Sequence, residues 1–339
     1  MTEADVIVGL SDRETIPRIC LSLVGGHPVP EPTYSKVITG PPHTAYLRIA
    51  EGCDNRCSYC AIPMIRGEFR SVPEEAIIAE AVELASIGIR ELVLVAQDTT
   101  NYGADLEGAS LPRLLGKLAE VDGISWIRLL YANPAKFTGE LTESMASLPQ
   151  VLPYVDMPVQ HISGKVLKRM SRPADPARIR DLVHKLRERI DGIVLRTTLM
   201  VGFPGETDGD FRELLDFMET ARFERLGAFA YSPEEGTRAL DYTDIVPPDL
   251  ADERLRSVME TQSSISESFQ NSLVGREFDM IVDDTDTKAE TVTGRTYMDA
   301  PEIDGNVIAA GSVKKKQAMV RVKITGAGPY DLNGEIIQP

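Results

Sequence analysis

Three cysteines lie within eight residues of one another: Cys53, Cys57 and Cys60. They form a C-x3-C-x2-C motif that directly follows a predicted strand over residues 45–52. Three closely spaced thiolates can bind three of the four irons of a [4Fe–4S] cluster, which leaves the fourth iron open to a substrate or cofactor. The motif therefore predicts an iron–sulfur centre at which a ligand binds directly to the metal.

Two other interpretations of the same cysteines stay open from the residues alone. The first is structural zinc, which requires four protein ligands in a closed site; His43, ten residues away, is the nearest further candidate. The second is three core cysteines without a metal. Cys20, the fourth cysteine of the chain, stands alone and is predicted to be a buried helix residue. A cysteine cluster of this kind in a reducing compartment favours metal binding over disulfides.

Strands and helices alternate regularly from residue 43 onward. The predicted strands span residues 45–52, 91–98, 126–134, 152–160, 193–203 and 224–233, and the predicted helices span residues 73–88, 111–121, 138–148, 179–190 and 210–221. Such alternation predicts an α/β fold with a parallel sheet and helices outside it, curled into a barrel or partial barrel. Chemistry is then expected at the carboxyl ends of the strands.

Composition changes mark four segments. Residues 1–27 predict a short strand (5–9) and a helix (13–24), and residues 28–42 contain five prolines and predict a stiff linker. The barrel is expected over residues 43–270, ending in a long polar helix. Residues 271–339 alternate in short segments separated by Gly, Asp and Asn, which predicts a small antiparallel β-barrel.

The overall charge restricts the class of partner. The chain contains 36 basic and 52 acidic residues, which gives a net charge of −16. A negative field repels phosphate, so a basic protein partner is expected and tRNA is not. Because no apolar run approaches about 18–20 residues and the amino terminus lacks a signal pattern, we expect no membrane association and a cytoplasmic location.

The cysteine motif, placed after the first strand of a six-unit barrel, resembles the radical S-adenosylmethionine (SAM) superfamily. The stretch over residues 51–71, with Arg66-Gly67 and Arg70-Ser71, is similar to the methylthiotransferases of that superfamily. The resemblance implies a radical SAM partial (β/α)6 TIM-like barrel followed by a TRAM-like β-barrel. It also implies two cofactors, a [4Fe–4S] cluster whose open iron chelates SAM, and SAM itself, which yields a 5′-deoxyadenosyl radical.

Two further stretches resemble one branch of these enzymes, the RimO family. They are VAQDTTNYG over residues 95–103 and GRTYMDAPEIDG over residues 294–305. The resemblance implies methylthiolation of the β-carbon of an aspartate in protein twelve of the small ribosomal subunit, with flavodoxin or ferredoxin as electron donor. The alternatives are a tRNA adenosine methylthiotransferase and a non-catalytic, metal-stabilised binding module.

The resemblance and the strand ends together give a set of candidate cofactor-binding residues. They are Tyr59, Gln97, Asp98, Thr99, Gln160, Arg196, Gly202, Gly205 and Tyr231. Polar residues at strand ends suit a barrel site, but Asp98 and Thr99 also suit a turn or helix cap. Tyr59 is expected near adenine or simply in the core. An inward Arg196 needs a carboxylate, either that of SAM or a structural Asp.

Two features bear on the resemblance to the family. Full-length methylthiotransferases carry an amino-terminal domain whose three cysteines bind a second [4Fe–4S] cluster, whereas residues 1–27 resemble only the end of that domain and contain Cys20 alone. From residue 271 to 339 there are eight Lys/Arg and eleven Asp/Glu, a net charge of 8 − 11 = −3. Asp283, Asp284 and Asp286 are predicted to cluster on one turn. An acidic second barrel favours a basic protein substrate over tRNA.

Overall fold

The computed structural model describes residues 6, 8, 15–23, 40–172, 174–314 and 318–338. The chain divides into two units, residues 1–39 and residues 40–339. In the first unit the described helix is α1 (Ile16–Leu23), none of whose residues is buried. Cys20 lies on α1 and is exposed, so the prediction of a buried cysteine is wrong. Eight residues of helix offer no core of their own in which to bury it. Most of the predicted strand over 5–9 and linker over 28–42 lies outside the described residues.

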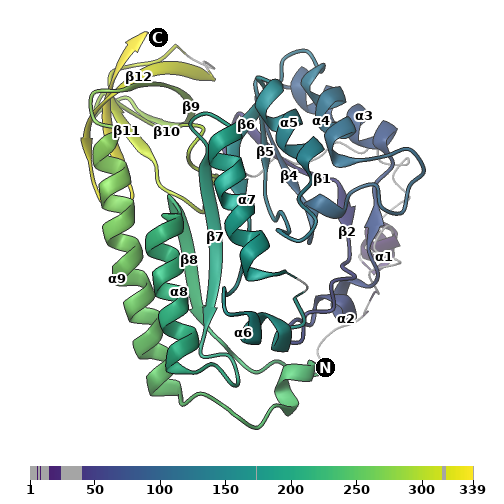
Figure 1. Cartoon of the computed structure of the whole chain (residues 1–339). Coiled ribbons are helices and arrows are strands. Elements are labelled where there is room, and N and C mark those ends of the chain that lie inside the picture. The colour runs from purple at the N-terminus through teal and green to yellow at the C-terminus, as the bar shows by residue number, and fades with distance from the viewer. Residues whose placement is uncertain are drawn as a thin grey trace. The chain divides into compact units, whose positions relative to one another are not determined.

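Six parallel strands form the sheet of the second unit, in the order β1-β4-β5-β6-β7-β8 (Figure 1). Their bounds are β1 (Thr44–Arg48), β4 (Glu91–Val95), β5 (Trp126–Leu129), β6 (Val151–Asp156), β7 (Val194–Val201) and β8 (Arg225–Ala230). Because β1 and β8 form the two edges, the barrel is partial. The predicted α/β partial barrel with a parallel sheet is confirmed.

Helices cover the outer face of this sheet, as Figure 1 shows. Their bounds are α3 (Glu74–Ser86), α4 (Leu111–Ala119), α5 (Gly139–Ser147), α7 (Pro176–Arg189) and α8 (Asp208–Ala221). Four of the five begin after a side chain that accepts a hydrogen bond from the first turn, namely Ser110, Thr138, Asp175 and Thr207. Such caps satisfy backbone N–H groups that have no partner within the helix.

Several short elements at the carboxyl ends of the strands were not predicted. They are α2 (Ile62–Arg66), β3 (Arg70–Ser71), η2 (Thr99–Asn101), α6 (Gly164–Arg169) and η3 (Arg238–Asp241), and the predicted strand over residues 45–52 is divided into β1 and a separate β2 (Ala50–Glu51). Each is too short to produce a periodic hydrophobic pattern. Together they surround the cysteine motif.

The long helix α9 (Pro248–Ser272) runs along β8 and α8 toward the second barrel (Figure 1). Although α9 has 25 residues, no described helix is both long and apolar enough to cross a bilayer. The second barrel is closed, in the order β10-β11-β13-β12-β9. Its strands are β9 (Glu277–Asp286), β10 (Thr291–Arg295), β11 (Val307–Ala310), β12 (Met319–Ala327) and β13 (Leu332–Gln338).

The predicted small β-barrel is confirmed with two corrections. The pair β11–β13 is parallel, whereas the other pairs are antiparallel. Asp283, Asp284 and Asp286 lie in strand β9 rather than on a turn. Residues alternate across a strand, and Asp283 binds the guanidinium of Arg295 at 2.7 Å between Oδ2 and Nε. That carboxylate is therefore engaged within the protein and does not face a partner.

Buried and partly buried ion pairs join the second barrel to the sheet. Arg225 at the start of β8 binds Asp299 at 2.5 Å, and Arg196 in β7 binds Asp304 at 3.3 Å. Asp299 and Asp304 belong to the segment over residues 296–305, which follows β10. Two acidic groups of the second barrel thus neutralise arginines of the first, which leaves fewer acidic groups on the surface than the sequence count suggested.

Candidate active site

The cysteine motif lies in a loop whose two ends are joined by the ladder between β2 and β3. Gly52 begins this loop with a φ of +78°, and a methyl group there would lie 2.1 Å from the carbonyl oxygen of Glu68. The next residue, Cys53, donates its backbone N–H to the carbonyl of Gly67 at 3.2 Å. The backbone on the two sides of the loop therefore approaches so closely that only glycine fits directly before Cys53.

Ser58 fixes the loop between its second and third cysteines. Its N–H donates to the carbonyl of Met170 at 2.9 Å, and its hydroxyl donates to the carbonyl of Arg169 at 2.8 Å. Its own carbonyl accepts from the N–H of Ala239 at 2.8 Å. The end of α6 and the start of η3 thus hold the cysteine loop from outside, which restricts where the thiols point.

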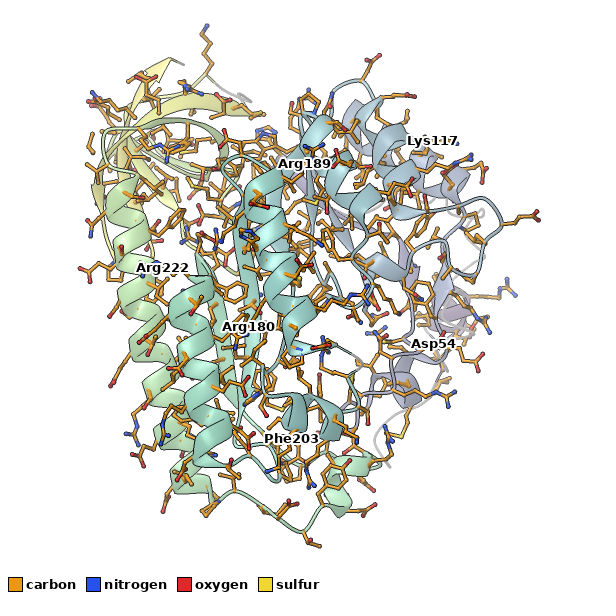
Figure 2. All side chains as sticks on the ribbon, in the orientation of Figure 1. Asp54, Lys117, Arg180, Arg189, Phe203 and Arg222 are labelled. Carbon is orange, nitrogen blue, oxygen red and sulfur yellow. The ribbon has the colours of Figure 1, made fainter. Side chains whose placement is uncertain are left out.

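A cavity of about 720 Å³ lies between the cysteine loop and the ends of the sheet strands, and all three cysteines line it. Figure 2 labels Asp54 of the loop and Phe203 after β7, both in the lower half of the view, away from the second barrel. The predicted site residues that line the cavity are Cys53, Cys57, Tyr59, Cys60, Gln97, Asp98 and Gln160. The cysteine loop and the segments after β4 and β6 therefore meet at one place, as a barrel site requires.

Two buried amide oxygens in this cavity, Oε1 of Gln97 and Oε1 of Gln160, have no hydrogen-bond partner among the described residues. Gln160 has a φ of +68° and is held from both sides: its N–H donates to Thr198 at 2.9 Å, and its carbonyl accepts from Met200 at 2.8 Å. A buried acceptor without a partner costs free energy, so a ligand that brings N–H donors fits here. The ammonium group of an amino-acid moiety, such as that of SAM, is a donor of this kind.

The three thiols share one cavity and are close enough to influence one another's protonation. Burial raises the pKa of the Cys53 and Cys60 thiols, and the neighbouring Cys57 raises both further. Among the described residues no three His, Cys, Asp or Glu side chains are arranged to hold a metal ion. Zinc needs ligands that converge on one atom, whereas the thiolates of a cluster bind different irons. Three thiols on one cavity fit the cluster, which would hold them deprotonated.

Asp98, after β4, is held by four donors and is only 2% exposed. Its Oδ2 accepts from Asn55 Nδ2 at 2.7 Å, from Lys136 Nζ at 2.9 Å and from Asn133 Nδ2 at 3.4 Å. Its Oδ1 accepts from the Thr100 hydroxyl at 2.6 Å. Asp98 thus ties the cysteine loop to the ends of β4 and β5. Contact between Asp98 and a cofactor stays a prediction.

Some predicted cofactor-binding residues are not among those that line the cavity: Thr99, Arg196, Gly202, Gly205 and Tyr231. The Thr99 hydroxyl donates to the carbonyl of Leu130 at 2.7 Å. Arg196 binds Asp156 at 2.8 Å and Asp304 at 3.3 Å. Arg196 was predicted to bind either the carboxylate of SAM or a structural Asp, and the structure shows structural Asp partners.

The two glycines after β7 are required by the packing of the protein. Gly202 has a φ of +70°, and a methyl group there would lie 2.5 Å from the Ala251 Cβ. Gly205 has a φ of +83°, and a methyl group there would lie 2.6 Å from Asp244 Oδ2. Gly202 thus needs glycine for the close approach of α9, and Gly205 for its left-handed backbone, whether or not a ligand is bound.

An aromatic cluster packs against the cysteine loop through Tyr59. The ring of Phe203 stands edge-on to those of Tyr59, Tyr231 and Tyr242, with centroid distances of 6.3, 5.2 and 6.1 Å. Tyr59 also lines the cavity, and its contact with adenine stays a prediction. The Tyr231 hydroxyl is buried without a partner among the described residues.

The cavity residues that sequence reasoning missed include Asn55, Tyr131, Arg172 and Ile303. Asn55 lies inside the cysteine motif and Tyr131 follows β5. Both could have been predicted from the sequence, because site residues are expected in the motif and at the carboxyl ends of the strands. Ile303 comes from the second barrel. Arg172 follows α6 and lies 115 residues from Cys57, which it contacts, so no local pattern indicates it.

Comparisons with known proteins agree with this geometry. The chain matches the Radical SAM superfamily over residues 47–218 and the TRAM domain over residues 274–337. It is 47% identical over 306 residues to the ribosomal protein uS12 methylthiotransferase RimO of Desulforamulus reducens, covering 89% of this chain and 69% of that protein. It is 44% identical over 349 residues to RimO of Geobacter sulfurreducens, covering 99% and 78%. The chain belongs to the RimO family.

Solved structures of other radical SAM enzymes share the fold of this RimO-family chain. The coproporphyrinogen III oxidase HemN of Escherichia coli matches with a TM-score of 0.53 at 18% identity, covering 67% of this chain and 53% of that one. The radical SAM methyltransferase TsrM of Kitasatospora setae, with tryptophan and a SAM analogue bound, matches with a TM-score of 0.50 at 17% identity, covering 66% and 52%. The matched superfamily region contains all three cysteines of the loop.

Proposed function

We propose that this chain methylthiolates the β-carbon of an aspartate in ribosomal protein uS12. The observation that carries the proposal is one cavity lined by Cys53, Cys57 and Cys60 together with the unpartnered oxygens of Gln97 and Gln160. It occurs in a chain that is 44–47% identical to relatives named for this reaction. Those names favour uS12 over a tRNA adenosine as the substrate.

The chain's own residues have separable tasks in this reaction. Cys53, Cys57 and Cys60 would hold a [4Fe–4S] cluster, and Gln97 and Gln160 present acceptor oxygens to the ammonium group of SAM. When bound, cluster and SAM together supply the radical that removes a hydrogen atom from an unactivated carbon. The protein contributes fixed positions for both cofactors.

The remaining cavity wall serves to exclude water. It includes the apolar side chains of Ala50, Val95, Leu130, Ala132 and Ile303. Reactive species need such shielding from solvent. The Ile303 side chain is supplied by the second barrel, so the TRAM-type domain takes part in enclosing the site.

Further partners belong to the same proposal. We propose that the sulfur comes from a second [4Fe–4S] cluster whose ligands are not among the four cysteines of this chain. A flavodoxin or ferredoxin supplies the electron, and tRNA and membranes have no part. The cytoplasm is the compartment in which such reduced thiols persist.

The experiment is mass spectrometry of uS12 from a strain in which the gene encoding this chain is deleted, with nucleoside analysis of tRNA in parallel. We expect loss of methylthio-aspartate from uS12, its return on complementation, and no change in tRNA. Loss of a methylthio group from tRNA alone would overturn the choice of substrate. Unchanged uS12 and tRNA would overturn the enzymatic proposal as a whole.

A further inference from the structure

Arg172 directs its guanidinium group at one of the cluster cysteines. Its Nη1 lies 3.8 Å from Cys57 Sγ and donates to the Tyr59 hydroxyl at 3.2 Å. Its Nη2 donates to the carbonyl of Pro158 at 2.7 Å. Three contacts on two nitrogens fix the plane of the group, so its position beside the sulfur is set by the fold.

The segment that carries Arg172 is itself attached to the cysteine loop. Arg169 and Met170, directly before it, accept the two hydrogen bonds of Ser58. Arg238 in η3 links the cysteine loop to this segment, because it donates to the carbonyl of Arg56 at 2.9 Å and to the Ser171 hydroxyl at 2.8 Å. The cation and the thiol therefore belong to one connected structure and move together.

The charge of Arg172 has no carboxylate partner within ion-pair distance among the described residues. Arg48, the other cation among the described residues that line the cavity, differs in this respect because it binds Glu51 at 2.5 Å. Nε of Arg172 is also buried without a partner among the described residues. A largely enclosed, uncompensated cation is costly unless an anion joins it.

The group expected at Cys57 is such an anion. An oxidised [4Fe–4S]²⁺ core with three thiolates carries a net charge of −1, and taking up one electron makes it −2. A fixed positive charge next to a ligand sulfur stabilises the second state more than the first. Hydrogen bonds and charge near the sulfurs are among the features that set the reduction potential of iron–sulfur clusters.

We propose that Arg172 is the counter-charge of this cluster and raises its reduction potential. One electron enters the cluster from the donor protein, no bond forms or breaks, and no proton moves. Arg172 is a positioning residue because it acts through Cys57 and does not touch the reacting atoms. The inference rests on the proposed cluster site.

The test is an EPR-monitored redox titration of the anaerobically reconstituted full chain, without SAM, so that no ligand carboxylate takes part. Arg172→Gln removes the charge, Arg172→Lys keeps it, and Lys168→Gln removes an exposed charge from α6, the helix that precedes Arg172. For Arg172→Gln we expect the ratio of reduced to oxidised cluster at a fixed potential to fall by about tenfold or more, which is about 59 mV for a one-electron couple. Arg172→Lys should lie between Arg172→Gln and wild type, and Lys168→Gln should match wild type.

Each outcome decides the proposal. The proposal is overturned if Arg172→Gln has full iron content and the midpoint potential of the wild type. It is also overturned if Lys168→Gln shifts the midpoint potential as much as Arg172→Gln does. If Arg172→Gln binds no cluster, the result for Arg172→Lys decides. An Arg172→Lys protein that keeps its iron and a near wild-type midpoint potential supports the role of the charge. Loss of iron from both variants, with unchanged thermal unfolding, contradicts that role. If the wild type holds no cluster, the proposed function fails first, which is distinct from failure of the role of Arg172.

Discussion

Arg295 of the second barrel and Glu91 of the sheet form a fully buried ion pair, with 2.9 Å between Nη2 and Oε2 and exposed fractions of 2% and 0%. Arg128 in β5 binds the other oxygen of Glu91 at 2.7 Å. Burial raises the pKa of this carboxyl, but the two guanidinium groups outweigh burial and leave the pKa below its usual value. Glu91 is therefore the charged centre of the contact between the two barrels.

Glu91→Gln should destabilise the chain by about 3–5 kcal/mol, because it leaves the buried guanidinium of Arg128 without a carboxylate and Arg295 with Asp283 alone. The measurement is the free energy of unfolding from urea titration. Glu277→Gln is the matched control: its pair with Arg321 is 3.9 Å long and exposed, so it should cost less than about 1 kcal/mol. Equal effects of the two substitutions would contradict a structural role of the buried pair.

Gly52→Ala should abolish cluster binding. The left-handed backbone and the carbonyl of Glu68 at 2.1 Å from the added methyl group force the two sides of the cysteine loop apart. Iron content and visible absorbance after anaerobic reconstitution provide the measurement. Gly108→Ala has a similar φ of +71° but open space around it, so it should cost roughly 1–2 kcal/mol and keep the cluster. Full iron content in Gly52→Ala would contradict the described loop.

Asp210, in the first turn of α8, makes stability depend on pH below 4. Burial raises the pKa of this carboxyl, but hydrogen bonds from Ser163 and Thr207 outweigh burial and lower the pKa to about 2. A group whose pKa is lowered by folding stabilises the folded state above its unfolded pKa of 3.8, and this contribution is lost as the pH falls toward 2. The difference in unfolding free energy between wild type and Asp210→Asn should therefore shrink over that interval. A difference that stays constant from pH 4 to pH 2 would contradict the lowered pKa.

Sequence reasoning succeeded where a feature repeats or is local. Strand–helix alternation gave all six sheet strands, because buried parallel strands such as β4 are almost continuously apolar. The cysteine spacing located the loop that lines the cavity, because its three thiols lie within eight residues. The short helices α2 and α6 were missed, since five or six residues are too few for a periodic pattern.

The rest of the site depends on contacts between residues far apart in the chain. Arg172 meets Cys57 across 115 positions, and Arg196 meets Asp304 across 108. No window of sequence relates such residues. The segment over 296–305 illustrates the limit: its resemblance to one branch of a family was visible, but its position inside the contact between the two barrels was not.

The most direct test of the central claim is anaerobic reconstitution of the chain followed by EPR of the reduced protein with and without SAM, and by assay of 5′-deoxyadenosine. Cys57→Ala serves as the comparison, because two thiolates do not retain the cluster. We predict a [4Fe–4S] signal that SAM perturbs, together with 5′-deoxyadenosine, in the wild type, and neither in the variant. A wild-type protein that binds zinc and does not cleave SAM, or a variant that keeps its iron and cleaves SAM normally, would contradict the account.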